Sequence, residues 1–122
     1  MIDVINRKYY SGFEGEPELV LVNGENKLII WIGYFEAILD ALLETNVEKK
    51  GILKEYITHE GWYDESPWVL KNIQLTIKQL RHFDLDKVRQ SDNIKSVLPH
   101  LVQEMIQFLE NAKSEYVEIE YD

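Results

Sequence analysis

The 122 residues suit one domain of common size, and a content of 45% apolar and 11% aromatic residues excludes a disordered acidic tail. The absence of cysteine excludes disulfides and thiolate metal sites. Thirteen basic against 22 acidic residues give a net charge of −9, which disfavours direct binding to nucleic acid or anionic lipid.

The N-terminal residues Met1-Ile2-Asp3-Val4 lack the basic and long apolar regions of a secretory signal. The longest apolar stretch, from Leu28 through Ile32 toward Phe35, is far too short to span a membrane. We therefore expect a cytoplasmic protein with no membrane partner.

The first third of the chain predicts β-strands. Residues 2–9 form a plausible strand with a turn over residues 12–17, and residues 18–22 and 27–32 flank the segment Asn23-Gly24-Glu25-Asn26. Asn-Gly between apolar runs is a strong hairpin signal, because both residues tolerate positive φ. These strands predict an N-terminal antiparallel β-meander.

Helices are predicted in the middle of the chain. Phe35, Ile38, Leu39, Leu42 and Leu43 recur at helical spacing, and the helix is expected to end near Asn46. Residues 52–59 fit either a short helix or a strand, and helix is favoured. Ser66 and Pro67 form a good N-cap and N1 pair, so the next helix is expected to start there and reach about Phe83.

The last third predicts an irregular segment over residues 85–93, then a helix and a strand. The helix has a broad apolar face from Val97 to Ala112 and tolerates Pro99 if Ser96 is its cap. Residues 115–122 alternate, as in a half-buried strand. The prediction is a single α+β domain over residues 1–122, with three to four helices packed on an antiparallel or mixed sheet and a C-terminal strand that returns to it.

Motifs for catalysis, metals or cofactors are lacking. His59, His82 and His100 lie in different segments without zinc-ligand spacing, and no Gly-x-Ser-x-Gly elbow or P-loop is present. The segment from His82 to Asp86 matches a metal loop only loosely and fits a solvated helix end better. We expect no catalytic residue, metal or cofactor, although the many carboxylates leave a small hydrolase as an alternative.

Charge is unevenly distributed along the chain. The segment Lys71–Lys95 has a local excess of basic residues, while both flanking parts are acidic. These basic side chains either offset acidic neighbours or pair with acidic groups of a partner. The acidic groups predicted to bind a basic partner are Glu14, Glu16 and Glu18 near the first turn and Glu118, Glu120 and Asp122 on one face of the last strand.

Carboxylates at alternate positions of a strand lie about 6.6–6.8 Å apart, close to the spacing of phosphates along a nucleic-acid strand. The row at the last strand is therefore interpreted as a phosphate mimic or as charge that protects an edge strand from aggregation. A second candidate surface is the loop containing Trp62, Tyr63, Asp64 and Glu65, whose aromatic and acidic side chains are typical of interface hot spots.

The chain resembles the small acidic immunity proteins that bacteria encode beside secreted or contact-delivered toxins. The resemblance rests on size, the lack of cysteine, the order of elements and the stretch Gly61-Trp62-Tyr63-Asp64-Glu65-Ser66-Pro67-Trp68. It implies a cytoplasmic monomer or weak dimer that binds and neutralises a cognate basic toxin domain, often a nuclease. The alternatives are a regulatory or adaptor subunit that dimerises through its sheet, and a DNA-mimic inhibitor.

Overall fold

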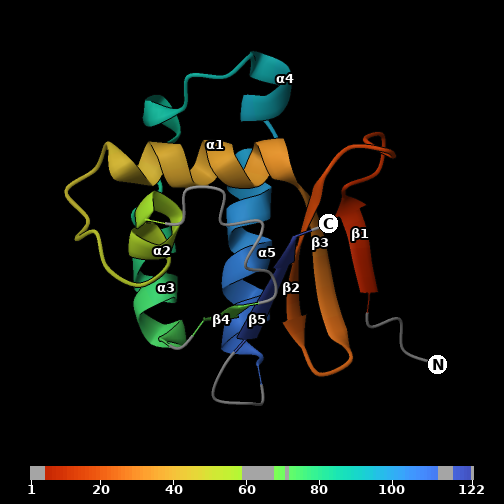
Figure 1. The fold of residues 1–122 in the computed structure, drawn as a ribbon. Helices are drawn as coiled ribbons and strands as arrows, with labels where there is room; N and C mark the ends of the chain where they lie inside the picture. The colour runs from red at the N-terminus through yellow and green to blue at the C-terminus, as the bar shows by residue number, and fades with distance from the viewer. Residues whose placement is uncertain (1–4, 59–67, 71, 113–116, 122) are drawn as a thin grey trace.

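The computed structural model describes residues 5–58, 68–70, 72–112 and 117–121. The strands are β1 (Ile5–Tyr9), β2 (Glu18–Asn23), β3 (Asn26–Trp31), β4 (Trp68–Leu70) and β5 (Val117–Tyr121). The helices are α1 (Ile32–Leu43), α2 (Ile52–Thr58), α3 (Ile73–Leu80), the 3-10 turn η2 (Leu85–Lys87), α4 (Asp92–Lys95) and α5 (Leu98–Glu110). This arrangement confirms the α+β class (Figure 1).

The five strands form one mixed sheet in the order β1-β3-β2-β5-β4. Strands β2 and β3 are the predicted antiparallel hairpin, with Asn23 opposite Asn26 and a loop of Gly24 and Glu25. Gly24 has a φ of 63°, whereas no described residue other than glycine has a positive φ. Glycine at the first loop position is the pattern of a type II′ turn, which suits the twist of the two strands.

Strand β1 pairs with β3 and runs parallel to it, so the first three strands do not follow the order of a simple meander. The segment from Tyr10 to Pro17 must therefore cross the end of β3 before it enters β2. This crossing segment, here called the arch, is held there by hydrogen bonds to Trp31 and Ile32, including one from the Ile32 amide to the Pro17 carbonyl at 3.3 Å.

The C-terminal strand β5 returns to the sheet as predicted and lies between β2 and β4. It is antiparallel to both neighbours, with Ile119 opposite Leu21 of β2 and Trp68 of β4. Because β5 is an interior strand, the interpretation of its glutamates as protection of an exposed edge is wrong.

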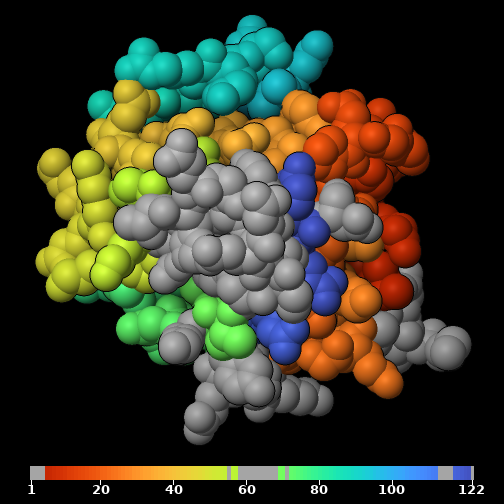
Figure 2. Space-filling view, in the orientation of Figure 1, coloured from red at the N-terminus to blue at the C-terminus, as the bar shows by residue number. Residues whose placement is uncertain are grey.

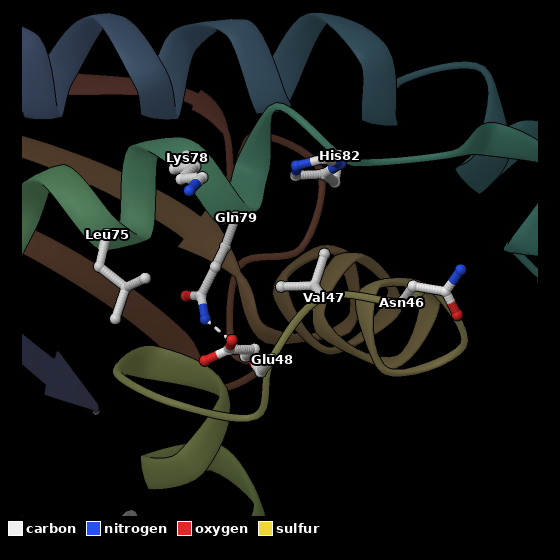
Figure 3. A pocket seen from close by; sticks show the side chains of 7 residues that line it. All are labelled: Asn46, Val47, Glu48, Leu75, Lys78, Gln79 and His82. Atoms are coloured by element: carbon white, nitrogen blue, oxygen red, sulfur yellow. Dashed lines mark hydrogen bonds between the residues drawn. The ribbon is translucent and has the colours of Figure 1, made fainter.

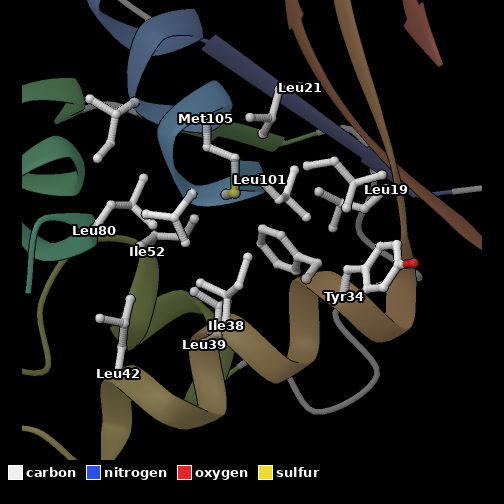
Figure 4. Packing of buried hydrophobic residues seen from close by; sticks show 14 of the residues in the cluster. Leu19, Leu21, Tyr34, Ile38, Leu39, Leu42, Ile52, Leu80, Leu101 and Met105 are labelled. Atoms are coloured by element: carbon white, nitrogen blue, oxygen red, sulfur yellow. The ribbon is translucent and has the colours of Figure 1, made fainter. Parts of the chain in front are cut away.

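The helices and the sheet share one core on one face of the sheet. Alternate residues of the strands point into it, including Leu19 and Leu21 of β2, which contact the same buried cluster as residues of α1, α2, α3 and α5. Figure 4 shows these side chains meeting, with Ile38 and Leu42 from α1 and Leu101 and Met105 from α5. Each of these four helical side chains is at most 1% exposed, so burial of apolar surface dominates the stability of the fold.

The predicted helix start at Ser66 and Pro67 is wrong, because Trp68–Leu70 is strand β4. The helix begins instead at Ile73, where the side chain of Asn72 accepts a hydrogen bond from the Leu75 amide at 3.0 Å. Pairing with β5 takes the residues after Pro67 into the sheet, and Asn72 then supplies the cap.

The other helix expectations are met in part. Residues 52–58 are helical, which settles the choice between helix and strand. Helix α5 carries Pro99 in its first turn, as expected, but Val97 is its N-cap and makes no side-chain cap bond. Ser96 ends α4, and its hydroxyl donates to the Asn93 carbonyl at 3.3 Å. The segment expected to be irregular contains η2 and the start of α4.

None of the helices in the described part of the chain combines the length and the apolar character that a membrane span requires.

Candidate binding surface

Three of the predicted acidic residues lie together on the face of the sheet that points away from the helices. Leu19, Leu21 and Ile119 belong to the core, so the alternating positions of β2 and β5 point to the opposite side. We call the resulting surface the acidic face. It consists of Glu18, Val20 and Val22 of β2, Val69 of β4, and Glu118 and Glu120 of β5.

Register sets the neighbours on the acidic face. Glu120 lies opposite Val20, and Glu118 lies between Val22 of β2 and Val69 of β4. Each β5 carboxylate therefore has at least one valine beside it on an adjacent strand. In Figure 2, β5 (dark blue) reaches the molecular surface next to the β2–β3 hairpin (orange).

Apolar side chains form the middle of this side of the sheet. Val20 of β2 lies opposite Ile29 of β3. These two side chains are 5% and 4% exposed, and neither belongs to the core cluster. Val69 is 37% exposed, which is unusual for a strand valine in this fold. Val20 and Ile29 are therefore already covered within the chain, and of these three side chains only Val69 offers apolar area to a partner.

The carboxylates of the acidic face are not neutralised by ion pairs within the described residues. Glu18, Glu118 and Glu120 are half-buried, and the ion pairs of the described chain lie elsewhere. Lys27 of β3, opposite Val22, is a cation on the same side of the sheet. Unpaired and partly desolvated carboxylates favour a basic partner, because charge-assisted hydrogen bonds are stronger than neutral ones.

The arch brings an aromatic cluster to the end of the acidic face. The rings of Phe13 and Trp31 stack with centroids 4.1 Å apart, and Tyr34 meets both rings edge to face. The Trp31 indole N–H donates to the Glu16 carboxylate at 3.3 Å, and Trp31 lies opposite Glu18 across β2 and β3. Glu16, Trp31 and Glu18 therefore connect the arch to the acidic face.

Within the arch, Glu14 accepts a hydrogen bond through its carboxylate and Glu16 accepts one through its backbone carbonyl. Glu14 accepts a hydrogen bond from the Gly12 amide at 3.0 Å, and backbone hydrogen bonds lower the pKa of this carboxyl. The Tyr10 hydroxyl donates to the Glu16 carbonyl at 2.6 Å. Both glutamates hold the arch in shape and still place negative charge at the surface, since both are exposed.

Sequence reasoning missed the aromatic cluster. Phe13 directly follows Gly12 in the arch, and Trp31 and Tyr34 fall at the junction of β3 and α1. An added Cβ at Gly33 would lie 2.3 Å from a ring carbon of Trp31, so the indole covers this glycine. Gly33, which lies between Trp31 and Tyr34, is the sequence signal that could have indicated the cluster.

The remaining predicted partner-binding residues, Trp62, Tyr63, Asp64, Glu65 and Asp122, lie outside the described residues.

Basic side chains of the segment Lys71–Lys95 pair within the chain. Arg81 bonds the carboxylate of Glu110 at 3.1 Å, and Arg89 forms a two-pronged pair with Glu44. The Arg89 guanidinium lowers the pKa of the Glu44 carboxyl by hydrogen bonding. These two pairs support the interpretation that the basic segment offsets acidic neighbours.

A concavity lies between α3 and the loop that follows α1 (Figure 3). It has a volume of about 300 Å³ and is lined by Asn46, Val47, Glu48, Leu75, Lys78, Gln79 and His82. The Gln79 amide donates to the carbonyls of Glu48 and Lys50 across it. Within the described residues, no three histidine or carboxylate side chains are grouped so as to hold a metal ion.

Comparisons of the chain with protein-family models, with curated proteins and with solved structures give no match.

Proposed function

We propose that this chain is an immunity protein, which binds a cognate basic toxin domain in the bacterial cytoplasm and blocks its activity. The observation that carries the proposal is the acidic face, where the half-buried carboxylates of Glu18, Glu118 and Glu120 lie on one side of the sheet together with the exposed side chain of Val69. A protein that acts by occlusion needs such a surface and no catalytic group.

Electrostatics supports association with a basic partner. The net charge of −9 and the carboxylates of the acidic face and arch speed the encounter with a positively charged domain. Apolar contact with the exposed side chain of Val69 then slows dissociation, because desolvated contacts carry most of the binding energy of an interface. A nuclease domain, with its basic substrate groove, has the charge that this surface complements.

The alternatives have less support. Self-association through the acidic face would bring like charges together, which costs binding energy. A DNA mimic needs a long row of carboxylates, whereas the described part of β5 presents Glu118 and Glu120. The described residues show no buried carboxyl with a strongly raised pKa, which a small hydrolase would need.

The test is co-expression of this chain with the toxin domain encoded by a neighbouring reading frame. We expect the toxin alone to stop bacterial growth, the pair to restore it, and the two proteins to elute as one complex in size-exclusion chromatography. Growth arrest that persists at equal toxin levels, with no complex formed, would refute the proposed function.

A further inference from the structure

We propose that the concavity between α3 and the loop after α1 binds a small organic carboxylate that also carries an N–H donor. The carboxylate of this ligand meets Lys78, and its N–H donates to the buried side-chain oxygen of Gln79. The inference goes beyond the proposed function and does not depend on it, because the site lies among the helices and loops and not on the acidic face.

The first step is an oxygen without a partner. Gln79 is 1% exposed, and its Nε2 donates to the carbonyls of Glu48 at 3.0 Å and Lys50 at 2.8 Å. These two bonds fix the orientation of the amide, because the reversed amide would set its oxygen against both carbonyls. Oε1 has no hydrogen-bond partner within the described structure. Since buried acceptors in native proteins are normally paired, this oxygen points to a donor that comes from a bound molecule.

The second step is the position of this oxygen. A Cβ added to Gly51 would lie 3.0 Å from Cδ2 of Leu75 and 3.7 Å from Oε1 of Gln79, so both atoms adjoin the same point. Figure 3 shows Oε1 on the side of the carboxamide that faces Leu75. Leu75 is half-buried and lines the concavity, so a change of its rotamer uncovers Oε1 toward that space. Rotamer changes of this kind are common when a partner binds.

The third step is the charge at the concavity. Lys78 forms no ion pair within the described residues, whereas Glu48, on the opposite side in Figure 3, pairs with Lys50 at 2.9 Å. The hydrogen bond from Lys50 is the main cause that lowers the pKa of the Glu48 carboxyl, and the charge of Lys78 adds a smaller effect. Two cations against one carboxylate leave a local excess of positive charge. This excess favours an anionic ligand.

The fourth step is the size and the lining of the concavity. Val47 of the loop and Leu75 of α3 are half-buried and supply apolar walls. The volume of about 300 Å³ is at the lower end of the range for ligand pockets, which combine apolar walls with a few fixed polar groups. The occupant is therefore a small molecule whose donor and negative charge are separated by a few bonds.

Other occupants match only part of this site. A cation would be repelled by Lys78, and an inorganic anion such as chloride would leave Oε1 of Gln79 without a donor. A water molecule would satisfy Oε1 but would leave Lys78 without a counter-charge. A carboxylate with a nearby N–H satisfies both groups at once.

The experiment titrates the whole chain with N-acetylglycine and two matched controls. Levulinate keeps the charge and shape but has CH₂ in place of N–H, and the methyl ester of N-acetylglycine keeps the N–H but has no charge. Binding is followed by NMR at physiological salt, which screens distant carboxylates. We expect N-acetylglycine to bind at least about threefold more tightly than either control. Its largest shifts should fall on Val47, Leu75, Lys78 and the side-chain amide of Gln79.

Two charge-matched variants separate the site from the net charge. Lys78→Met should weaken N-acetylglycine at least about threefold. The control, Lys95→Met, makes the same change of charge on α4, outside the lining of the concavity, and should alter the affinity less than twofold. The melting temperature of each variant shows whether it is folded, and the comparison of the three ligands on the natural chain needs no variant.

Several outcomes would overturn the inference. Equal binding of levulinate and N-acetylglycine would show that Oε1 of Gln79 accepts no bond from the ligand, and equal weakening by both lysine variants would reduce the effect to net charge. Shifts centred on other residues would place the site elsewhere. The absence of saturable shifts would leave Oε1 to a water molecule alone. Each of these results is independent of growth rescue, which tests the proposed function.

Discussion

Replacement of Gln79 tests how the loop between α1 and α2 is fixed to α3. The Gln79 side chain is 1% exposed, and its amide nitrogen donates to the carbonyls of Glu48 at 3.0 Å and Lys50 at 2.8 Å. Its carbonyl oxygen has no hydrogen-bond partner within the described structure. Gln79 therefore acts as a hydrogen-bond donor to the loop. A substitution that removes the donor and one that replaces it with an acceptor should lower the free energy of unfolding by different amounts.

Gln79→Met keeps the length and loses the two donated bonds, each with a net contribution of about 0.5–1.5 kcal/mol. It also removes the unpaired buried oxygen, which offsets part of the loss, so we expect the free energy of unfolding to fall by about 1 kcal/mol. Gln79→Glu instead turns a carboxylate toward two carbonyl oxygens in a buried position. Its expected cost is about 3 kcal/mol or more at neutral pH.

The difference between these variants should depend on pH. Burial raises the pKa of the carboxyl introduced by Gln79→Glu above its unfolded value of about 4.3. The loss of unfolding free energy in Gln79→Glu is therefore smallest below the unfolded pKa, where the introduced carboxyl is protonated and can donate one hydrogen bond. The loss grows as pH rises from there toward the pKa of the folded state.

The assay is urea unfolding of the natural chain and both variants at about pH 4 and about pH 7, with equal slopes required for comparison. Gln79→Met serves as the reference at each pH, so that the acid sensitivity of other carboxylates cancels. If Gln79→Glu were as stable as Gln79→Met at both pH values, the amide would not be the donor that fixes this loop.

Three further substitutions test other parts of the fold. Gly33→Ala places a Cβ 2.3 Å from the stacked ring of Trp31 and should cost about 1–3 kcal/mol with a shifted indole N–H resonance; an unchanged resonance and melting temperature would contradict the packing. Gly24→Ala forces alanine into a φ of 63° and should lower the free energy of unfolding by about 1 kcal/mol. Coincident thermal melts of the variant and the natural chain would contradict this. Arg89 lowers the pKa of the Glu44 carboxyl, so this ion pair stabilises the folded state at pH values above the pKa that Glu44 has in the unfolded chain. The stabilisation is lost as pH falls toward the lowered pKa of the folded state. Glu44→Gln should therefore lower the melting temperature at neutral pH but not in acid, and a gap that stays constant with pH would refute this.

Local sequence patterns were sufficient where neighbours in the chain determine the structure. The hairpin at Gly24 needs only a two-residue loop between apolar runs, and α1 and α5 show their apolar faces directly in the residue spacing. The alternation of residues 117–121 predicted both the strand and the side on which Glu118 and Glu120 lie.

Pairing between distant residues was not predictable in the same way. Trp68–Leu70 follows a good helix-capping pair and has apolar residues at helical spacing ahead, yet it becomes strand β4 because β5 pairs with it. Strand preference depends on such partners more than on the residues themselves. The parallel pairing of β1 with β3 has the same origin, since only the arch across Trp31 makes it possible.

The candidate site was predictable as a set of residues but not as a surface. Glu18 lies about 100 positions from Glu118 and Glu120, and only the register of β2 with β5 brings them to one face. The aromatic cluster of Phe13, Trp31 and Tyr34 likewise unites two segments that no local pattern connects.

The interior position of β5 has a consequence for the order in which the protein is made. Strand β4 has no sheet partner in the described structure except β5, and β2 lacks one neighbour until β5 is in place. The sheet therefore cannot close until residues 117–121 have been synthesised. The nascent protein holds an incomplete sheet with an open edge until then.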